Sequence, residues 1–133
     1  MKVTGLDGRE HSWNPSSGST SKSSKLHKKA KEVLDKCFPY DRILEEVSLA
    51  GTRTSIRKGT LRADFFISNR NLIIEVHGEQ HFKFNSFHYT SKLSFFKAKA
   101  RDRDKKEWCD LNDITIIEFN FNEDVDYWRR KIE

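Results

Sequence analysis

Three polar side chains interrupt two short apolar runs near the middle of the 133-residue chain, and their types fit metal chemistry. Asp64 lies in residues 61–67, while Glu75 and His77 lie in residues 72–77. A carboxylate is costly to bury in an apolar strand unless it is paired or holds a metal. Two carboxylates on adjacent strands, with an imidazole two residues after the second, therefore predict a cation site.

The two runs have the pattern of a β-hairpin. The two-residue period of a strand places the apolar side chains Leu72, Ile74 and Val76 on one face. Glu75 and His77 then share the other face. The intervening residues 68–71, Ser-Asn-Arg-Asn, have the composition of a turn, so the two strands are predicted to pair.

A cation bound at this hairpin could serve the hydrolysis of a phosphodiester bond. A divalent cation can bind a phosphate oxygen, lower the pKa of a bound water and stabilise a departing oxyanion. Mg²⁺ prefers oxygen ligands, which Asp64 and Glu75 supply, with the backbone carbonyl of Val76 as a third candidate. His77 could act on the same water or phosphate, as a neutral base or as a protonated group. A surface hairpin with ordinary polar positions is the alternative.

The other elements follow from periodicity and from end signals. Ser23 and Ser24 are good N-cap residues for a helix that ends before Pro39. The predicted order is a helix over 24–38, strands over 42–49, 61–67 and 72–77, a helix over 91–111, a strand over 114–121 and a helix from Asn122. Residues 114–121 are apolar enough for a central strand. The prediction is one α/β domain over 22–133 with a small mixed sheet, preceded by a flexible arm over 1–21.

The positive charge of the chain favours a polyanionic partner. Its net charge is +5 and its pI is about 9.2. The loop over 50–60 carries Arg53, Arg57 and Lys58 and no acid, so it either binds a phosphate backbone or is a mobile solvated loop. Arg101 and Lys105, one helical turn apart, either face the site and hold phosphate or belong to a general basic surface.

Several protein classes are excluded by composition. The chain has no apolar run of about eighteen residues, so no membrane span is predicted. Its start lacks an apolar signal core, so we expect an intracellular protein, in a bacterium or a phage-infected host. Cys37 and Cys109 lie far apart in helical patterns, which indicates buried thiols rather than a disulfide or a zinc site.

The order of elements, with Ala63-Asp64 followed by Glu75-Val76-His77, resembles the PD-(D/E)XK nuclease superfamily. The stretch LIIEVHGEQHF, and later ARDRDKKEWC before a strand, are similar to phage homing endonucleases related to very-short-patch repair endonucleases. In those proteins a histidine replaces the superfamily lysine. The resemblance covers roughly residues 24–121. It implies a metal-dependent DNA endonuclease, with Asp64 and Glu75 binding Mg²⁺ (or Mn²⁺) and His77 in the place of the catalytic lysine.

The chain also departs from this pattern. Many superfamily members carry a glutamate early on the first helix, and His27 stands at the matching position. Either His27 takes that role, or Glu32 or Glu46 does, or the second metal position is absent. Gln80 and His81 either contact the scissile phosphate and order water, or cap the turn after Gly78. The zinc ligands of the repair enzymes are missing, so mismatch repair itself is not expected.

The resulting hypothesis is a DNA endonuclease that nicks one strand or cuts both, acting as a monomer or a homodimer. The replacement of the usual lysine and glutamate by His77 and His27 keeps a non-catalytic nucleic-acid-binding protein open as an alternative. A nuclease acting on branched DNA or on RNA is a third hypothesis.

Overall fold

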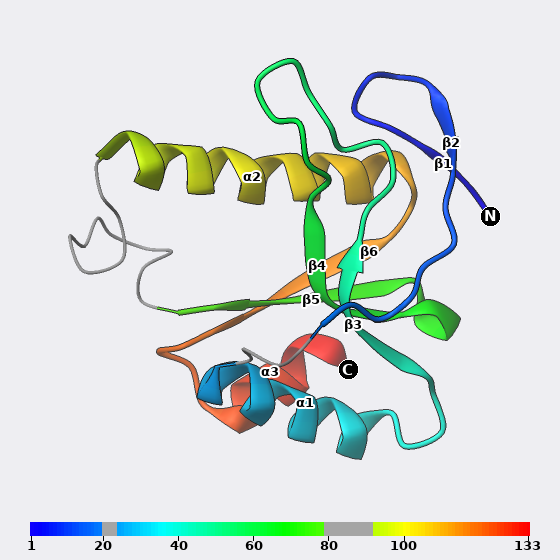
Figure 1. Ribbon diagram of the computed structural model, residues 1–133. Coiled ribbons are helices and arrows are strands. Elements are labelled where there is room, and N and C mark those ends of the chain that lie inside the picture. Colours follow the sequence, from blue (N-terminus) through cyan, green and yellow to red (C-terminus); the bar gives the residue numbers. More distant parts are fainter. Residues whose placement is uncertain (20–23, 79–91) are drawn as a thin grey trace.

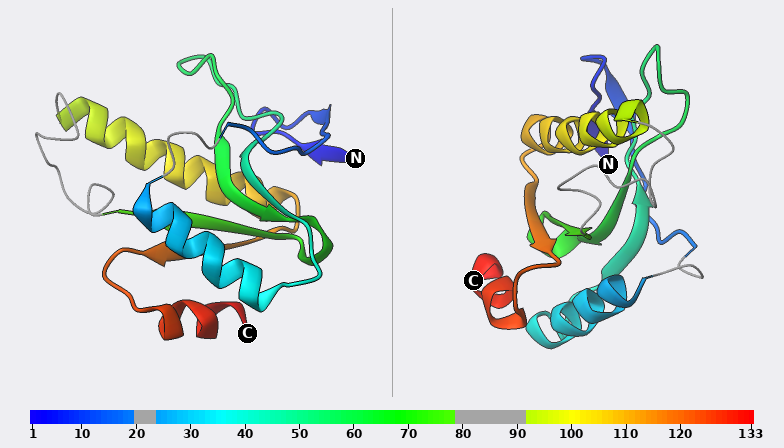
Figure 2. Two further views of the ribbon diagram at one scale, coloured as in Figure 1. Left: turned by 60° about the horizontal axis from the view of Figure 1, so that its bottom comes forward. Right: turned by 90° about the vertical axis from the view of Figure 1, so that its left-hand side faces the viewer.

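The protein is a mixed α/β domain with one four-stranded sheet between helices (Figure 1). The computed structural model describes residues 1–19, 24–78 and 92–133. The strands of the sheet are β3 (Ile43–Ser48), β4 (Arg62–Ile67), β5 (Leu72–His77) and β6 (Thr115–Asn120), in that spatial order. Helix α2 (Lys92–Leu111) covers one face, and α1 (Lys25–Cys37) and α3 (Val125–Ile132) lie on the other (Figure 2).

The predicted hairpin of β4 and β5 is confirmed. The two strands pair antiparallel, with Ile67 opposite Leu72, and a short 3₁₀ turn η1 (Ser68–Arg70) joins them. Asn71 closes that turn with a left-handed φ of 47°, a conformation that asparagine tolerates better than most residues. Strand β3 pairs antiparallel with β4, and β6 pairs parallel with β5.

The prediction that residues 114–121 form a central strand is wrong, because β6 lies at the edge of the sheet. Its apolar character comes from its two covered faces. Phe119 is fully buried and stacks on Trp128 of α3, with ring centroids 4.6 Å apart. The ammonium of Lys131 donates to the carbonyl of Glu118 at 2.7 Å, which satisfies one backbone group of the strand.

Two apolar clusters, one on each face of the sheet, form the core. The cluster under α2 contains Phe66, Ile73 and Trp108, and the cluster under α1 and α3 contains Leu34 and Ile74 among others. Neighbouring residues of β5 thus face opposite clusters, as the two-residue period predicts. Glu75 and His77 share the side of Ile73, toward α2.

The first nineteen residues differ from the flexible arm that their composition predicts. β1 (Lys2–Thr4) and β2 (Glu10–Ser12) form an antiparallel hairpin, and the core includes Val3 and Trp13. The Trp13 ring lies 5.0 Å from the Phe66 ring, and its Nε1 donates to the carbonyl of Ser48 at 2.8 Å. This segment is therefore part of the domain.

The helix ends follow local capping. Ser24 caps α1 as predicted, with its hydroxyl accepting from the backbone N–H of His27 at 3.1 Å. The prediction that the last helix begins at Asn122 is wrong: α3 begins at Val125, and the Asp124 carboxylate caps it. Glu123 lies before the helix and pairs with Lys131 at 2.7 Å.

Both cysteines are free thiols, as the sequence predicts. Cys109 is buried, and this burial raises the pKa of its thiol to about 12, while Cys37 is only half-buried. None of the helices in the described ranges combines the length and apolar character needed to cross a membrane.

Candidate metal centre and its basic surroundings

Asp64 and Glu75 meet where β4 and β5 separate. The backbone pairing of the two strands ends at the pair Phe65 and Ile74, which lies next to Asp64 on one strand and next to Glu75 on the other. The backbone N–H of Asp64 donates to Glu75 Oε2 at 2.9 Å, and the N–H of Val76 donates to Asp64 Oδ2 at 2.7 Å. The two side chains therefore replace the missing ladder bonds and satisfy both strands. The two strands pair as expected and bring the carboxylates together, and Val76 engages Asp64 through its N–H. Metal binding by Asp64, Glu75 and the Val76 carbonyl stays a prediction.

Asp64 also lies beside a histidine and a second carboxylate from other elements. His27 of α1, Glu46 of β3 and Asp64 each offer a ligand atom, and these atoms lie within 4.8 Å of one another. We call these three residues the metal cluster. Two carboxylates and an imidazole from three elements converge on one point, which is the donor chemistry of a divalent cation site.

The orientation of His27 is fixed on both sides of its ring. Glu45 Oε1 lies 3.0 Å from His27 Nε2, so Nδ1 is the ring atom nearer to Glu46 Oε1, at 3.9 Å. The ring also stacks on Phe65, with centroids 4.4 Å apart. A carboxylate on the second ring nitrogen is the usual device that orients a metal-binding histidine.

Glu46 has a strained backbone at this point. Its φ of 51° is in the left-handed region, which a glutamate seldom adopts. It faces Asp64 across β3 and β4, in a gap between the flanking backbone pairs. Gly18 passes so close that a Cβ there would lie 2.6 Å from the Glu46 carbonyl oxygen. Strain of this kind concentrates at functional sites.

Glu75 forms a buried ion pair with Lys105 of α2. The lysine Nζ donates to Glu75 Oε1 at 2.5 Å, and Glu75 is only 2% exposed. Burial raises the pKa of Glu75 to about 7; Lys105 opposes that rise and Asp64 adds to it. Burial alone would lower the pKa of Lys105, but the charges of Glu75 and Asp64 raise it above its ordinary value. Glu75 therefore supports Asp64 from the α2 side rather than joining the metal cluster.

His77 lies beside the neighbouring strand. Its Nδ1 is 3.7 Å from Glu118 Oε2, and the Lys106 ammonium is 2.7 Å from Glu118 Oε1. His77 is 6% exposed and is not a member of the metal cluster. Sequence reasoning missed Glu118, although the signal that found Glu75 was present, because Glu118 also interrupts an apolar strand and stands opposite Glu75.

The predicted nucleic-acid contacts divide into two groups. Arg53, Lys58 and Arg101 have exposed side chains. Lys105 is paired with Glu75, and Arg57 donates to Asp104 Oδ2 at 3.0 Å. Carboxylates of the protein hold these last two cations, and their contact with phosphate stays a prediction. Gln80 and His81 lie outside the described residues.

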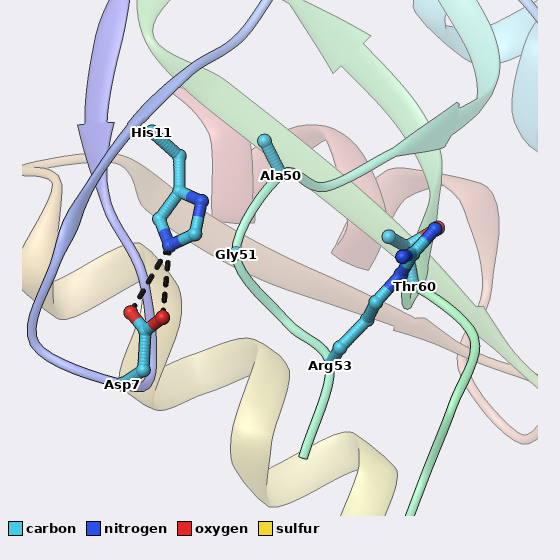
Figure 3. Close-up of a pocket in the computed structure, with 6 residues that line it drawn as sticks. All are labelled: Asp7, His11, Ala50, Gly51, Arg53 and Thr60. Atoms are coloured by element: carbon cyan, nitrogen blue, oxygen red, sulfur yellow. Dashed lines mark hydrogen bonds and ion pairs between the residues drawn. The ribbon is translucent and has the colours of Figure 1, made fainter.

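A hollow of about 300 Å³ lies between the N-terminal hairpin and the loop over residues 50–60 (Figure 3). Its lining residues are Asp7, His11, Ala50, Gly51, Arg53 and Thr60. His11 Nε2 lies 3.0 Å from Asp7 Oδ1, and the backbone N–H of Arg9, followed by His11, lowers the pKa of Asp7. Arg53 adds a guanidinium to this hollow beside the His11–Asp7 hydrogen bonds.

Comparison with known proteins gives one partial relative. The chain is 32% identical over 66 residues to the protein called Uncharacterized protein 033L of Invertebrate iridescent virus 3. The match covers 50% of this chain and 34% of the viral protein, so the chain spans about a third of the length of that relative. No family model and no solved structure matches the chain.

Proposed function

We propose that this protein is a metal-dependent DNA endonuclease that hydrolyses phosphodiester bonds. The observation that carries the proposal is the metal cluster, in which His27, Glu46 and Asp64 offer ligand atoms within 4.8 Å of one another. Asp64 and Glu75 on a β-hairpin, after a helix that carries His27, also support the PD-(D/E)XK arrangement.

The donor set fits a small divalent cation. The two carboxylates suit both Mg²⁺ and Mn²⁺, so either cation is a candidate, and the imidazole of His27 would add a nitrogen ligand. His27, Glu46 and Asp64 would hold the cation, and its chemistry would be Lewis-acid polarisation of a phosphate oxygen and a lower pKa for bound water.

The other residues of the site position this cluster. Glu45 orients His27, and the N–H of Val76 holds the Asp64 carboxylate. Lys105 holds Glu75, which in turn binds the backbone N–H of Asp64. The site is thus fixed from both faces of the sheet, and such preorganisation lowers the cost of assembling a catalytic geometry.

Cleavage of supercoiled plasmid in Mg²⁺ or Mn²⁺ tests the proposal, with EDTA as the metal-free control. We expect nicked or linear product from the wild type. Asp64→Asn should lower the rate by about 100-fold or more, because the amide is a poor ligand for the cation. The amide oxygen can still accept from Val76, so the fold should persist, as a thermal melt would check.

Asp126→Asn, the same change at an exposed carboxylate of α3, is the matched control and should cleave like the wild type. Intact plasmid in both metals, or cleavage that survives Asp64→Asn, would reject the endonuclease.

A non-catalytic nucleic-acid-binding protein is the second candidate. The Lys105–Glu75 ion pair favours it, since this pair keeps Glu75 out of the ligand set. Binding of duplex DNA without cleavage in either metal would be its signature. Linear duplex, four-way junction and RNA substrates in the same assay would define the class of nucleic acid.

A further inference from the structure

The loop between β3 and β4 ends in a tight turn with an apolar side chain at its tip. The Thr54 N–H donates to the Arg57 carbonyl at 2.9 Å, and the Arg57 N–H donates to the Thr54 carbonyl at 3.3 Å. Ser55 and Ile56 therefore form a two-residue tip. Ile56 is 94% exposed, and the loop projects from the sheet on the side of α2 (Figures 1 and 2).

Two internal anchors make this loop rigid. The buried Thr52 hydroxyl donates to the Leu49 carbonyl at 2.7 Å and accepts from the Leu61 N–H at 2.8 Å, which closes the base of the loop. Arg57 then bridges the Thr52 carbonyl and the Asp104 carboxylate of α2, at 3.0 Å each. The turn is tied to its own base and to the helix beneath it.

The N-terminal hairpin supports the loop from the other side. The Leu6 N–H donates to the Gly51 carbonyl at 2.8 Å. Gly51 has a φ of 81°, and a Cβ there would lie 2.7 Å from the Gly5 Cα, so this close approach requires glycine. The tip is therefore held in place by three separate parts of the chain.

The charge around the tip fits a nucleic-acid backbone. Arg53 and Lys58 are exposed on either side of the turn, and residues 50–60 contain no acid. Single exposed apolar residues are ordinary on protein surfaces. Here an isoleucine stands on a rigid, projecting turn between two cations, which is the arrangement of an apolar wedge with phosphate contacts beside it.

We propose that Ile56 is a wedge that inserts between base pairs of duplex DNA from the minor groove, while Arg53 and Lys58 bind the flanking phosphates. This inference rests on the proposed DNA partner. It adds which residues contact the DNA and how they would bend it. Minor-groove proteins insert isoleucine and similar side chains between base steps and kink the duplex. Because the turn is already ordered, little conformational entropy is lost on binding.

The chain also limits how far the wedge can lie from the metal cluster. Ile56 precedes Asp64 by eight residues, which span at most about 29 Å when fully extended. Base pairs in duplex DNA follow one another every 3.4 Å or so. The distorted step should therefore lie within about eight base pairs of the scissile phosphate.

Duplexes with 2-aminopurine at successive positions test the wedge, because its fluorescence rises when its base step is unstacked. The full chain is titrated in EDTA, so no cleavage occurs, against duplexes rich in the deformable TA and CA steps. We expect the wild type to raise the fluorescence. Ile56→Ala should abolish the rise and weaken binding about tenfold, the effect of losing a partly buried apolar contact.

Two variants keep the test specific to the wedge. Ser55→Ala changes the neighbouring tip residue and Ile56→Leu keeps an apolar side chain, so both should retain the rise. Binding without a rise, equal binding by Ile56→Ala, or absence of duplex binding would overturn the wedge. Equal, Ile56-dependent binding of single-stranded RNA would also overturn it.

Different results would reject the wedge proposal and the endonuclease proposal. An Ile56-dependent rise without plasmid cleavage in Mg²⁺ or Mn²⁺ supports the wedge and rejects the endonuclease. Cleavage that is independent of Ile56, without a rise, supports the endonuclease and rejects the wedge. Where both occur, mapped cuts should lie within about eight base pairs of the unstacked step.

Discussion

At the scale of single residues, the centre of the molecule is a series of interacting polar and charged side chains that crosses the sheet. Lys105 binds Glu75, Glu75 binds the backbone of Asp64, and Asp64 lies against His27 and Glu46. A buried ion pair is stable only when its remaining groups are also bonded, and here the backbone N–H of Asp64 meets that need. The Lys105–Glu75 ion pair therefore helps to hold Asp64 in its position.

This dependence predicts a strong coupling between Lys105 and Glu75. Lys105→Met leaves a buried carboxylate without its cation and should lower the free energy of unfolding by about 3–5 kcal/mol. The double variant Lys105→Met/Glu75→Gln should recover part of that loss, since the glutamine oxygen can still accept from Asp64. Urea denaturation of both single variants and the double variant measures the coupling.

Lys106→Met is the matched control for that cycle. Lys106 pairs with Glu118 but its side chain is 54% exposed, so its loss should cost no more than about 1 kcal/mol. Strictly additive effects of Lys105→Met and Glu75→Gln would contradict the coupling.

The sequence predicted the part of this site that lies on one hairpin. Asp64 and Glu75 were detectable because burying a carboxylate costs free energy, so a carboxylate in an apolar strand indicates a partner or a bound metal. Glu46 was only one of three alternatives, because its role depends on a left-handed backbone that its residue type disfavours. Lys105 belongs to a helix with many basic residues, and only the packing of α2 on the sheet distinguishes it from the others.

At the scale of elements, periodicity predicted the elements that are long enough to show it. Helix α1 and strands β3, β4 and β5 lie within two residues of their predicted bounds. The N-terminal hairpin was missed because each of its strands has only three residues, too few for a period to appear. Its attachment depends mainly on one side chain, Trp13, which packs on Phe66 and Trp108.

Because Trp13 is its main contact with the core, the N-terminal hairpin should stabilise the domain mainly through that side chain. Trp13→Ala removes a 3%-exposed ring from the core, and we expect a loss of about 3–5 kcal/mol in the free energy of unfolding. Urea denaturation followed by circular dichroism measures it. Tyr40→Ala, which removes a 97%-exposed ring, should have little effect. If the two variants were equally stable, residues 1–19 would be a loose arm after all.

At the scale of the whole molecule, the charge of +5 is less important than where its exposed part lies. The cations of Arg57, Lys105 and Lys131 are bound by carboxylates of the protein. Arg53 and Lys58 remain exposed on the loop that projects on the side of α2 (Figure 1). Helices α1 and α3 lie on the other face of the sheet. A DNA duplex bound through the loop should therefore be insensitive to charges near the C-terminal ends of those two helices.

Salt dependence of DNA binding tests this asymmetry. Each phosphate contact contributes a slope of about −0.9 to the plot of log K against log salt concentration. Arg53→Ala/Lys58→Ala should therefore make the slope shallower by about 1.8, measured by fluorescence anisotropy in EDTA. Lys36→Ala/Arg130→Ala removes the same charge from exposed positions on α1 and α3 and should leave the slope unchanged. If the two double variants changed the slope equally, DNA would respond to net charge alone and the loop would have no special place in binding.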